Sequence, residues 1–362
     1  GYDYAFDTPG QRAGLAGLAP LIAKARADVA HGQCLLVDNG DFLQGNSLAD
    51  WLSTHPVTAD HPLVASFNGL AYDAIGLGNH DLDFRTSYLE QFIAALDAPV
   101  ISTNLSESGI RDLHRSVTLT RLIETADGAV PLKIAIVSAL PDETAVWNKA
   151  MLADTAIISD PLATLPEHVA QLRQAGVDIV LALAHLGLGH AGAPDSIADA
   201  GARLIAEIPG IDAIVAGHTH RRFPDDMECD NVFPSNIPIV MPGVMGSDLG
   251  VIDLDLAQGA DGRWIVTDNT AQLWPQPVDI VPDPAFFARA SRAHNAARAD
   301  LAAPIGAPAD HLHSYFALLQ PANTMALSAR AKAILIQEAL QGSPHADLPL
   351  LATAAARAVG GA

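Results

Sequence analysis

The chain has 362 residues, 49% of them apolar, and a net charge of −21 with an isoelectric point near 4.8. This length allows one large domain or two. So acidic a balance excludes a long nucleic acid as partner, because binding a polyanion requires many Lys and Arg side chains. No stretch reaches the roughly 18 to 20 apolar residues of a membrane-spanning helix. The start shows no signal-peptide pattern, and Cys34 and Cys229 are expected to be two free thiols.

Apolar runs of strand length alternate with segments of helical spacing through most of the chain. The predicted helices cover residues 11–30, 47–54, 61–71, 86–96, 160–175, 196–208 and 283–303. The predicted strands cover residues 34–37, 73–77, 100–102, 178–184, 212–216 and 237–241. This alternation indicates layers of an α/β fold.

Two further regions depart from this alternation. Residues 115–139 are predicted as a β-ribbon with Asp127-Gly128 as its turn. The later β-rich part of the chain, whose β-type segments continue to about Trp274, suggests a second sheet packed on the first. Residues 311–362 are predicted as a strand, a helix and a loop without a closing element, so we expect the chain to be truncated at its C-terminus.

Four of the predicted strands end in polar side chains. In chain order these are Asp41, Asn79-His80-Asp81, His185 and His218-Thr219-His220. Because parallel strands share an edge of the sheet at their carboxyl ends, we expect the four turns to converge at one edge of one sheet. Carboxylate, amide and imidazole donors suit Mn, Fe or Zn ions, and the absence of thiolates argues against a structural zinc site. Two such ions that share a carboxylate form the usual clamp for displacement at phosphorus.

Each of these residues also has a simpler interpretation. Asp41 could cap the following helix, His185 could be a core histidine, and His218 and His220 could be a chance pair. Three other carboxylates begin predicted strands and therefore point to the opposite edge, where we expect a structural role: Asp73, Asp178 and Asp212.

Four stretches resemble the ordered motifs of the calcineurin-like metallophosphoesterases: Asn39-Gly40-Asp41, Gly78-Asn79-His80-Asp81, Ala184-His185 and Gly217-His218-Thr219-His220. Longer stretches resemble the branch of bacterial 2',3'-cyclic-nucleotide 2'-phosphodiesterases/3'-nucleotidases and periplasmic 5'-nucleotidases: residues 35–46, 209–220, 240–250 and 313–318. The resemblance runs over essentially the whole chain. It implies a four-layer α-β-β-α sandwich, with a catalytic domain over residues 1–282, a linker helix over 283–310 and the beginning of a nucleotide-binding domain over 311–362.

The resemblance also implies a set of metal ligands for two divalent ions, which could be Mn, Fe, Zn, Co or Mg. Asp41 would bridge the two ions, Asn79, His185 and His218 would complete the ligands of one, and His220 would bind the other.

His80 would face the phosphate of the substrate as the catalytic histidine, and Asn79 would also contact the substrate. Asp83 would orient His80, with Asp81 as the alternative partner. The family's first motif, Asp-x-His, is expected just upstream of Gly1, so the second metal site is expected to be incomplete in this chain. Residues Asp112-Leu113-His114 spell that motif but follow no apolar strand.

The resemblance implies a periplasmic hydrolase that converts 2',3'-cyclic nucleotides to 3'-nucleotides and then to nucleosides. Its partner would be a small nucleotide, and its oligomeric state stays open. A 5'-nucleotidase, a broad phosphodiesterase and a non-catalytic metal-binding module are alternatives. A dinucleotide-binding oxidoreductase is a further one, because residues 187–192 spell G-x-G-x-x-G, although Pro194 and Asp195 delay the following helix.

Overall fold

The computed structural model describes residues 2–4, 7–10, 13–30, 32–125, 128–152, 156–189, 196–225, 236–347 and 349. The chain divides into two compact units, residues 1–301 and 302–362. Every helix in these described ranges is too short or too polar to cross a lipid bilayer. Cys34 is a free thiol, and Cys229 lies outside the described residues.

The larger sheet of the first unit has six strands. In spatial order they are β13 (Arg222–Phe223), β14 (Ile239–Pro242), β12 (Ala213–Ala216), β11 (Ile179–Ala184), β9 (Gly128–Ala139) and β8 (Ser116–Thr125). The four inner strands are parallel, and β8 and β13 join them antiparallel at the edges. β11 is an almost continuous apolar run, as expected for a strand covered on both faces. The predicted ribbon is the pair β8 and β9, and Asp127 of its turn lies outside the described residues.

The smaller sheet has four parallel strands. In spatial order they are β3 (Val37–Asp38), β4 (Ala74–Gly76), β5 (Val100–Ile101) and β7 (Leu113–His114). Its inner face packs on the larger sheet: Ala74 and Ile101 meet Ile136 and Leu183 in one fully buried cluster. The two sheets therefore form the two central layers of the fold.

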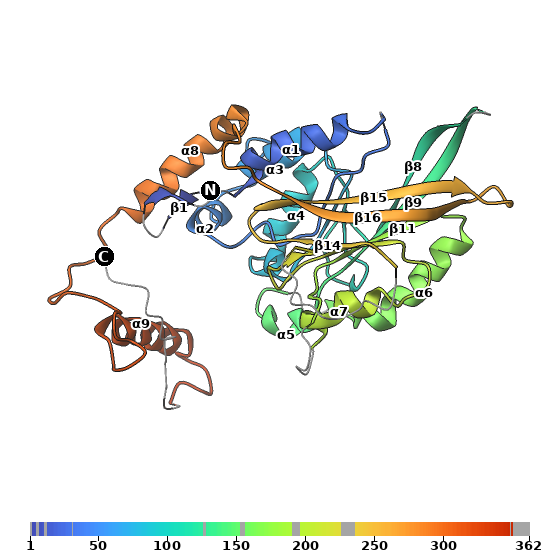
Figure 1. Ribbon diagram of the computed structural model, residues 1–362. Coiled ribbons are helices and arrows are strands. Elements are labelled where there is room, and N and C mark those ends of the chain that lie inside the picture. Colours follow the sequence, from blue (N-terminus) through green and yellow to red (C-terminus); the bar gives the residue numbers. More distant parts are fainter. Residues whose placement is uncertain are drawn as a thin grey trace. The chain divides into compact units, whose positions relative to one another are not determined.

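Helices cover the outer face of each sheet. Leu165 and Val169 of α6 (Pro161–Gln174) pack on the larger sheet together with α7 (Ile197–Ile205). Phe67 of α3 (Pro62–Leu70) and Phe92 of α4 (Thr86–Ala95) pack on the smaller one. Figure 1 shows α6 and α7 on one side of the long strands β9 and β11, and α3 and α4 on the other. This arrangement confirms the predicted four-layer α-β-β-α fold.

Other elements of the first unit surround these layers. They are β1 (Tyr2–Asp3), β2 (Thr8–Pro9), α1 (Leu15–Ala27), α2 (Ser47–Ser53), the 3₁₀ helix η1 (Asn79–Leu82), β6 (Leu105–Ser106), α5 (Thr144–Trp147), β10 (Ile157–Ile158), β15 (Asp248–Gln258), β16 (Trp264–Pro275) and α8 (Pro284–Leu301). β15 and β16 form an antiparallel hairpin, where the sequence predicted β-type segments to about Trp274. Phe286 of α8 is buried against Leu18 and Leu70, so this helix is part of the first unit.

Two sequence predictions about the fold are wrong. The four polar turns do not follow strands of one sheet, since β3 and β4 belong to the smaller sheet and β11 and β12 to the larger. The strand predicted after residue 311 is absent from the described part of the second unit, which contains α9 (Asn323–Ala339). Residues 314–320 form hydrogen-bonded turns instead, because no described strand of that unit offers them a partner to pair with.

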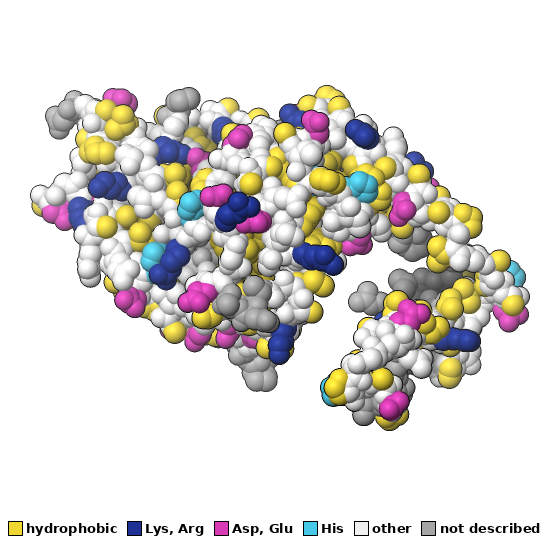
Figure 2. All heavy atoms as spheres, turned by 180° about the vertical axis from the view of Figure 1, so that it is seen from behind, with side chains coloured by type: hydrophobic (Ala, Val, Ile, Leu, Met, Phe, Trp, Pro, Cys, Tyr) yellow, Lys and Arg dark blue, Asp and Glu magenta, His cyan; other side chains and the backbone are white. Residues whose placement is uncertain are grey.

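The surface carries charges of both signs. On the described part of the face in Figure 2, Lys and Arg side chains are scattered among acidic and apolar ones rather than gathered in one basic patch. This distribution, with the net charge of −21, offers no local concentration of positive charge on that face for a polyanion.

Candidate active site

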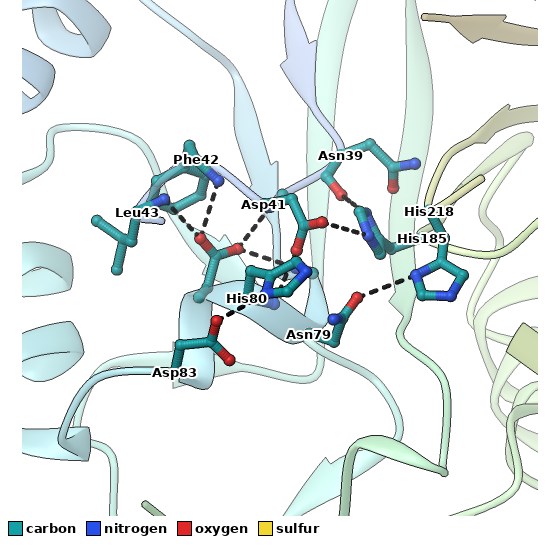
Figure 3. A network of polar contacts seen from close by, with 12 residues as sticks. Asn39, Asp41, Phe42, Leu43, Asn79, His80, Asp83, His185 and His218 are labelled. Carbon is teal, nitrogen blue, oxygen red and sulfur yellow. Dashed lines mark hydrogen bonds and ion pairs between the residues drawn. The ribbon is translucent and has the colours of Figure 1, made fainter. Parts of the chain in front are cut away.

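The predicted site residues follow two strands of each sheet. Asp41 and Asn79 come after β3 and β4, and His185 and His218 come after β11 and β12. Because the two sheets pack face to face, the carboxyl ends of these four strands lie together at the boundary between the layers. Figure 3 shows Asp41 directed at His185 and Asn79 directed at His218. The side chains therefore converge, although at two sheets rather than one.

Asp41 and His185 form the more deeply buried pair. Asp41 Oδ2 lies 3.0 Å from His185 Nε2, and His185 is only 4% exposed. The other ring nitrogen of His185, Nδ1, donates to the backbone oxygen of Asn39 at 3.0 Å, which fixes the ring. Burial acts against the charged forms of both side chains, but the attraction between them outweighs burial. This attraction raises the pKa of His185 and lowers the pKa of Asp41 to about 2.

Asn39 ties this pair to the larger sheet. Its side-chain amide donates to the backbone oxygens of Ala184 and Val215, at 3.2 and 3.0 Å. These oxygens belong to the ends of β11 and β12. Asn39 therefore holds the loop after β3 against the two strands that lead to His185 and His218.

Asn79 and His218 form a second pair across the sheets. Asn79 begins η1 and is 5% exposed, and its Oδ1 accepts from His218 Nδ1 at 3.0 Å. Trp147 at the end of α5 stacks on the His218 ring, with centroids 5.7 Å apart and planes within 7°. Burial and the nearby His185 lower the pKa of His218 to about 4, so this imidazole is neutral near pH 7. A neutral imidazole is the form that binds metal.

Asp81 holds the Asp41 loop in place. It is fully buried, and each of its carboxylate oxygens accepts two backbone N–H groups. Oδ2 accepts from Asp41 at 2.7 Å and from Gly78 at 2.9 Å, and Oδ1 accepts from Phe42 at 2.9 Å and from Leu43 at 3.0 Å. Burial and the charge of Asp41 raise the pKa of Asp81 to about 7, although these donors favour the ionised form.

Glycines allow the two loops to approach. A Cβ at Gly40 would lie 2.1 Å from the backbone nitrogen of Gly78, and a Cβ at Gly78 would lie 2.2 Å from Asp41 Oδ1. Gly40 also has a φ of 88°, a region that favours glycine. Gly40 and Gly78 are therefore required because any side chain there would prevent the loop after β3 from contacting the loop after β4.

His80 points to Asp83 rather than to the two pairs above. Its Nδ1 donates to Asp83 Oδ2 at 2.6 Å, and Asp83 Oδ1 accepts from Asn148 Nδ2, also at 2.6 Å. Burial opposes the charged imidazole, but the hydrogen bond to Asp83 and the charge of Asp41 outweigh it and raise the pKa of His80. The backbone N–H of His80 donates to Asp41 Oδ1 at 2.8 Å, so the two groups lie side by side.

A cavity of about 490 Å³ lies beside Asp83, between the end of α2 and the start of α4. Its volume is in the range of small-molecule sites. Its lining residues are Ser53, Thr54, His55, Pro56, Asp83, Phe84, Arg85, Ser87, Tyr88, Gln91 and Met151. Asp83 is therefore shared between this cavity and the contact with His80.

Three predicted metal ligands have an unusual backbone conformation. The φ angles of Asp41, His218 and His220 are 65°, 66° and 58°. Positive φ is uncommon outside glycine, and such residues cluster at functional sites. His220 is exposed, and no hydrogen bond or ion pair within the described ranges joins it to Asp41 or His185.

Comparison with known proteins identifies the family. The calcineurin-like phosphoesterase family matches residues 8–222, which is more than half of the chain. The chain belongs to this family. The similarity to curated proteins extends further: the 2',3'-cyclic-nucleotide 2'-phosphodiesterase/3'-nucleotidase of Salmonella typhimurium is 32% identical over 380 residues, and that of Haemophilus influenzae is 30% identical over 379. These alignments cover 99% of this chain but 58% and 57% of the two relatives, so it spans less than two thirds of their length.

Solved structures confirm the calcineurin-like fold. The calcineurin-like phosphoesterase YfkN from Bacillus subtilis superposes with a TM-score of 0.73 at 29% identity, covering 83% of this chain and 94% of that one. A putative 5'-nucleotidase from Staphylococcus aureus gives a TM-score of 0.62 at 20% identity, covering 79% of this chain and 54% of that one. The second likeness concerns the fold alone.

The family implies divalent metal ions, and the residues of this calcineurin-like site fit them in part. His185 Nε2 is buried and makes no hydrogen bond in the described structure, although Asp41 Oδ2 is 3.0 Å away. Oxygen and imidazole donors without thiolates suit Mn, Fe or Zn. However, no group of three or more His, Cys, Asp or Glu residues forms a metal cluster within the described ranges. The predicted ligands therefore stand as two pairs, Asp41 with His185 and Asn79 with His218.

The structure also bears on three alternative interpretations: Asp41 as a helix cap, the Asp-x-His motif that ends at His114, and the glycine motif that begins at Gly187. Asn46, not Asp41, caps α2, because its Oδ1 accepts from the backbone of Leu48 and Ala49 at 3.0 and 3.1 Å. His114 ends the edge strand β7 and is exposed, two strands away from β4. Gly187 and Gly189 donate to the backbone oxygens of Ala198 and Asp199, each at 2.7 Å, so this loop packs on α7, and residues 190–192 of the glycine motif lie outside the described residues.

The three carboxylates at strand starts are structural, as predicted. Asp73 and Asp212 form ion pairs with Arg121 and Arg173. The third, Asp178, accepts from two backbone N–H groups, at 2.9 and 3.2 Å.

Sequence reasoning missed two residues of this calcineurin-like site, Asn148 and Trp147. Trp147 ends the short helix α5 and Asn148 directly follows it, in a stretch without a recognisable motif, so only the tertiary structure brings them to His218 and Asp83.

Proposed function

We propose that this chain is the catalytic part of a metal-dependent phosphoesterase that hydrolyses 2',3'-cyclic nucleotides to 3'-nucleotides and then to nucleosides. The observation that carries the proposal is the position of the hydrogen-bonded pair of His80 and Asp83, next to Asp41 and its partner His185. The two bacterial relatives at 30 and 32% identity, which bear the name of this activity, support the choice of substrate.

The proposed metal ligands come from both sheets. Asp41, Asn79, His185 and His218 would hold one divalent ion, and Asp41 with His220 would contribute to a second. Divalent ions bound there supply positive charge that polarises the phosphoryl group and acidifies water. The low pKa of Asp41 and the low pKa of His218 keep these two side chains in the forms that bind metal.

His80 is the proposed general acid. Its Nδ1 donates to Asp83, which leaves Nε2 as the ring nitrogen that can face substrate. In the first hydrolysis the 2'-oxygen of the cyclic diester leaves and takes a proton from His80, while water adds to phosphorus. In the second, the 3'-oxygen leaves in the same way and releases nucleoside. The amide of Asn79, adjacent in η1, would contact a phosphoryl oxygen.

A substrate panel tests this proposal. The full-length protein is assayed with Mn²⁺ on 2',3'-cyclic AMP, 3'-AMP, 5'-AMP and bis-p-nitrophenyl phosphate. We expect the highest kcat/KM on 2',3'-cyclic AMP, with 3'-AMP also consumed. Turnover of 5'-AMP alone would contradict the substrate assignment, and turnover of none of the four with metal bound would contradict an enzymatic function.

The main alternative is a 5'-nucleotidase. Snake venom 5'-nucleotidase from Naja atra is 26% identical over 210 residues, which is 57% of this chain. That match covers less of the chain than the cyclic-nucleotide enzymes do, so we place it second. A metal-binding module without catalysis would bind Mn²⁺ and leave all four substrates intact. A periplasmic location is also part of the proposal, and cell fractionation of the native host tests it.

A further inference from the structure

Asn148 occupies a buried position behind the proposed general acid. It is 5% exposed and directly follows α5, and its side-chain amide donates to Asp83 Oδ1 at 2.6 Å. We propose that Asn148 is a positioning residue, which fixes Asp83 and through it the ring of His80. This inference rests on the proposed function, because it assigns Asn148 to the proton-donating step of that reaction.

The hydrogen bonds of Asp83 are divided between its two oxygens. Oδ1 accepts from Asn148 and Oδ2 accepts from His80 Nδ1, both at 2.6 Å. A carboxylate held by two donors on different oxygens cannot rotate without losing one of them. The side chain of Asp83 is 29% exposed, so water would compete for the free oxygen if the Asn148 amide were absent. The amide therefore selects the rotamer in which Oδ2 faces His80.

The backbone on both sides holds Asn148 itself. Its N–H donates to the oxygen of Thr144 at 2.9 Å, and its carbonyl oxygen accepts from Met151 and Leu152 at 2.8 and 3.1 Å. Thr144 is fully buried, which anchors the start of α5. An amide on so fixed a backbone presents its donor in one direction, as a positioning role requires.

The same short helix reaches the other half of the site. Trp147, the residue before Asn148, stacks on His218, one of the proposed metal ligands. α5 and the residue that follows it therefore contact both the His80–Asp83 pair and the Asn79–His218 pair. Damage to the whole helix would disturb metal binding, whereas loss of the Asn148 amide alone would disturb only proton donation.

Loss of proton donation and loss of metal binding should affect substrates with different leaving groups differently. A ribose oxygen leaves as a strong base and needs a proton from His80. p-Nitrophenolate is a weak base and leaves without one. A defect in positioning His80 should therefore slow hydrolysis of 2',3'-cyclic AMP but spare bis-p-nitrophenyl phosphate, whereas a defect in the metal ligands should slow both.

The experiment compares Asn148→Ala and the isosteric Asn148→Asp with Lys149→Ala, a change of the exposed neighbour, in the full-length protein with Mn²⁺. For both Asn148 variants we expect kcat on 2',3'-cyclic AMP to fall about 10- to 100-fold. We expect KM, and turnover of bis-p-nitrophenyl phosphate, to stay within about 3-fold of wild type. Lys149→Ala should match wild type on both substrates.

An equal fall on both substrates would overturn the inference, and so would unchanged turnover of 2',3'-cyclic AMP. A second readout is independent of activity: nuclear magnetic resonance of ¹⁵N-histidine-labelled protein reports the protonated nitrogen of His80. At a pH high enough to make His80 neutral, we expect a single Nδ1–H tautomer in the wild type and a mixture of tautomers in Asn148→Ala. A single form in both proteins would also overturn the inference, whereas a wild type inactive on every substrate would refute only the proposed function.

Discussion

Consecutive residues of one motif make unrelated contacts. Asn79 contacts His218, His80 contacts Asp83, and Asp81 binds the backbone of the Asp41 loop. The reason is local geometry: these residues form the 3₁₀ helix η1, in which successive side chains point about 120° apart. A stretch of three polar residues thus contributes to the proposed metal ligands, to the proposed substrate side and to the scaffold.

His80 provides the most direct test at the residue scale. Replacing it with Ala removes the proposed general acid but none of the proposed metal ligands. We expect kcat on 2',3'-cyclic AMP to fall about 10²- to 10⁴-fold with bound manganese unchanged, as measured by steady-state kinetics and elemental analysis. Near-wild-type turnover with intact metal would show that His80 has another role.

The sequence predicted the positions of polar residues that follow strands, but not the contacts that depend on tertiary structure alone. His185 and His218 follow apolar runs that are easily recognised as buried strands, so their positions were predictable. Asp81 was assigned only as an alternative partner of His80, since nothing in the pattern indicates four backbone donors around it. Asn148 lies 65 positions from Asp83, directly after a short helix without a motif.

At the scale of elements, the sequence predicted which segments are strands but not which sheet each one joins. Hydrophobic periodicity reports burial along one segment, whereas sheet membership depends on which neighbour it pairs with. β4 and β11 are both fully or almost fully buried, yet they lie in different layers. The residues still converge because the carboxyl ends of both sheets face the same boundary.

The junction between the loop after β3 and η1 depends on Asp81, and Asp81→Asn tests it. An amide has one acceptor oxygen, so two of the four backbone N–H groups would face an NH₂ group instead of an oxygen. We expect a loss of about 1–3 kcal/mol in the free energy of unfolding, measured by urea denaturation. An exposed change such as Asp50→Asn should leave stability nearly unchanged. Equal stability of Asp81→Asn and wild type would mean that this junction forms without the carboxylate.

At the scale of the whole molecule, stability of the folded chain depends on pH through a buried histidine. His61 is 5% exposed, its Nε2 lies 3.1 Å from the Tyr88 hydroxyl, and its Nδ1 has no hydrogen-bond partner in the described structure. Burial lowers the pKa of His61 from 6.5 to about 4. Between these two values the unfolded chain binds a proton that the folded chain does not, so stability falls as the pH falls.

His61→Gln should remove this dependence. Between pH 6.5 and pH 5, His61 lowers the free energy of unfolding of the wild type by about 1–2 kcal/mol. In urea denaturation, the free energy of unfolding of the variant should therefore fall by about 1–2 kcal/mol less over this pH range. His55→Gln, a change at an exposed histidine, serves as the control. A variant with the same pH dependence as wild type would refute the assignment to His61.

The measurement that tests the central claim most directly is kcat/KM for 2',3'-cyclic AMP in the presence of Mn²⁺, for the full-length wild type and for His185→Gln. His185 is the buried imidazole that pairs with Asp41, and its Nε2 has no hydrogen bond of its own. We predict a fall of at least about 100-fold, with less manganese bound, because a ligand of the proposed ion is lost. His168→Gln, on α6, should behave as wild type. Undiminished turnover by His185→Gln would contradict the account.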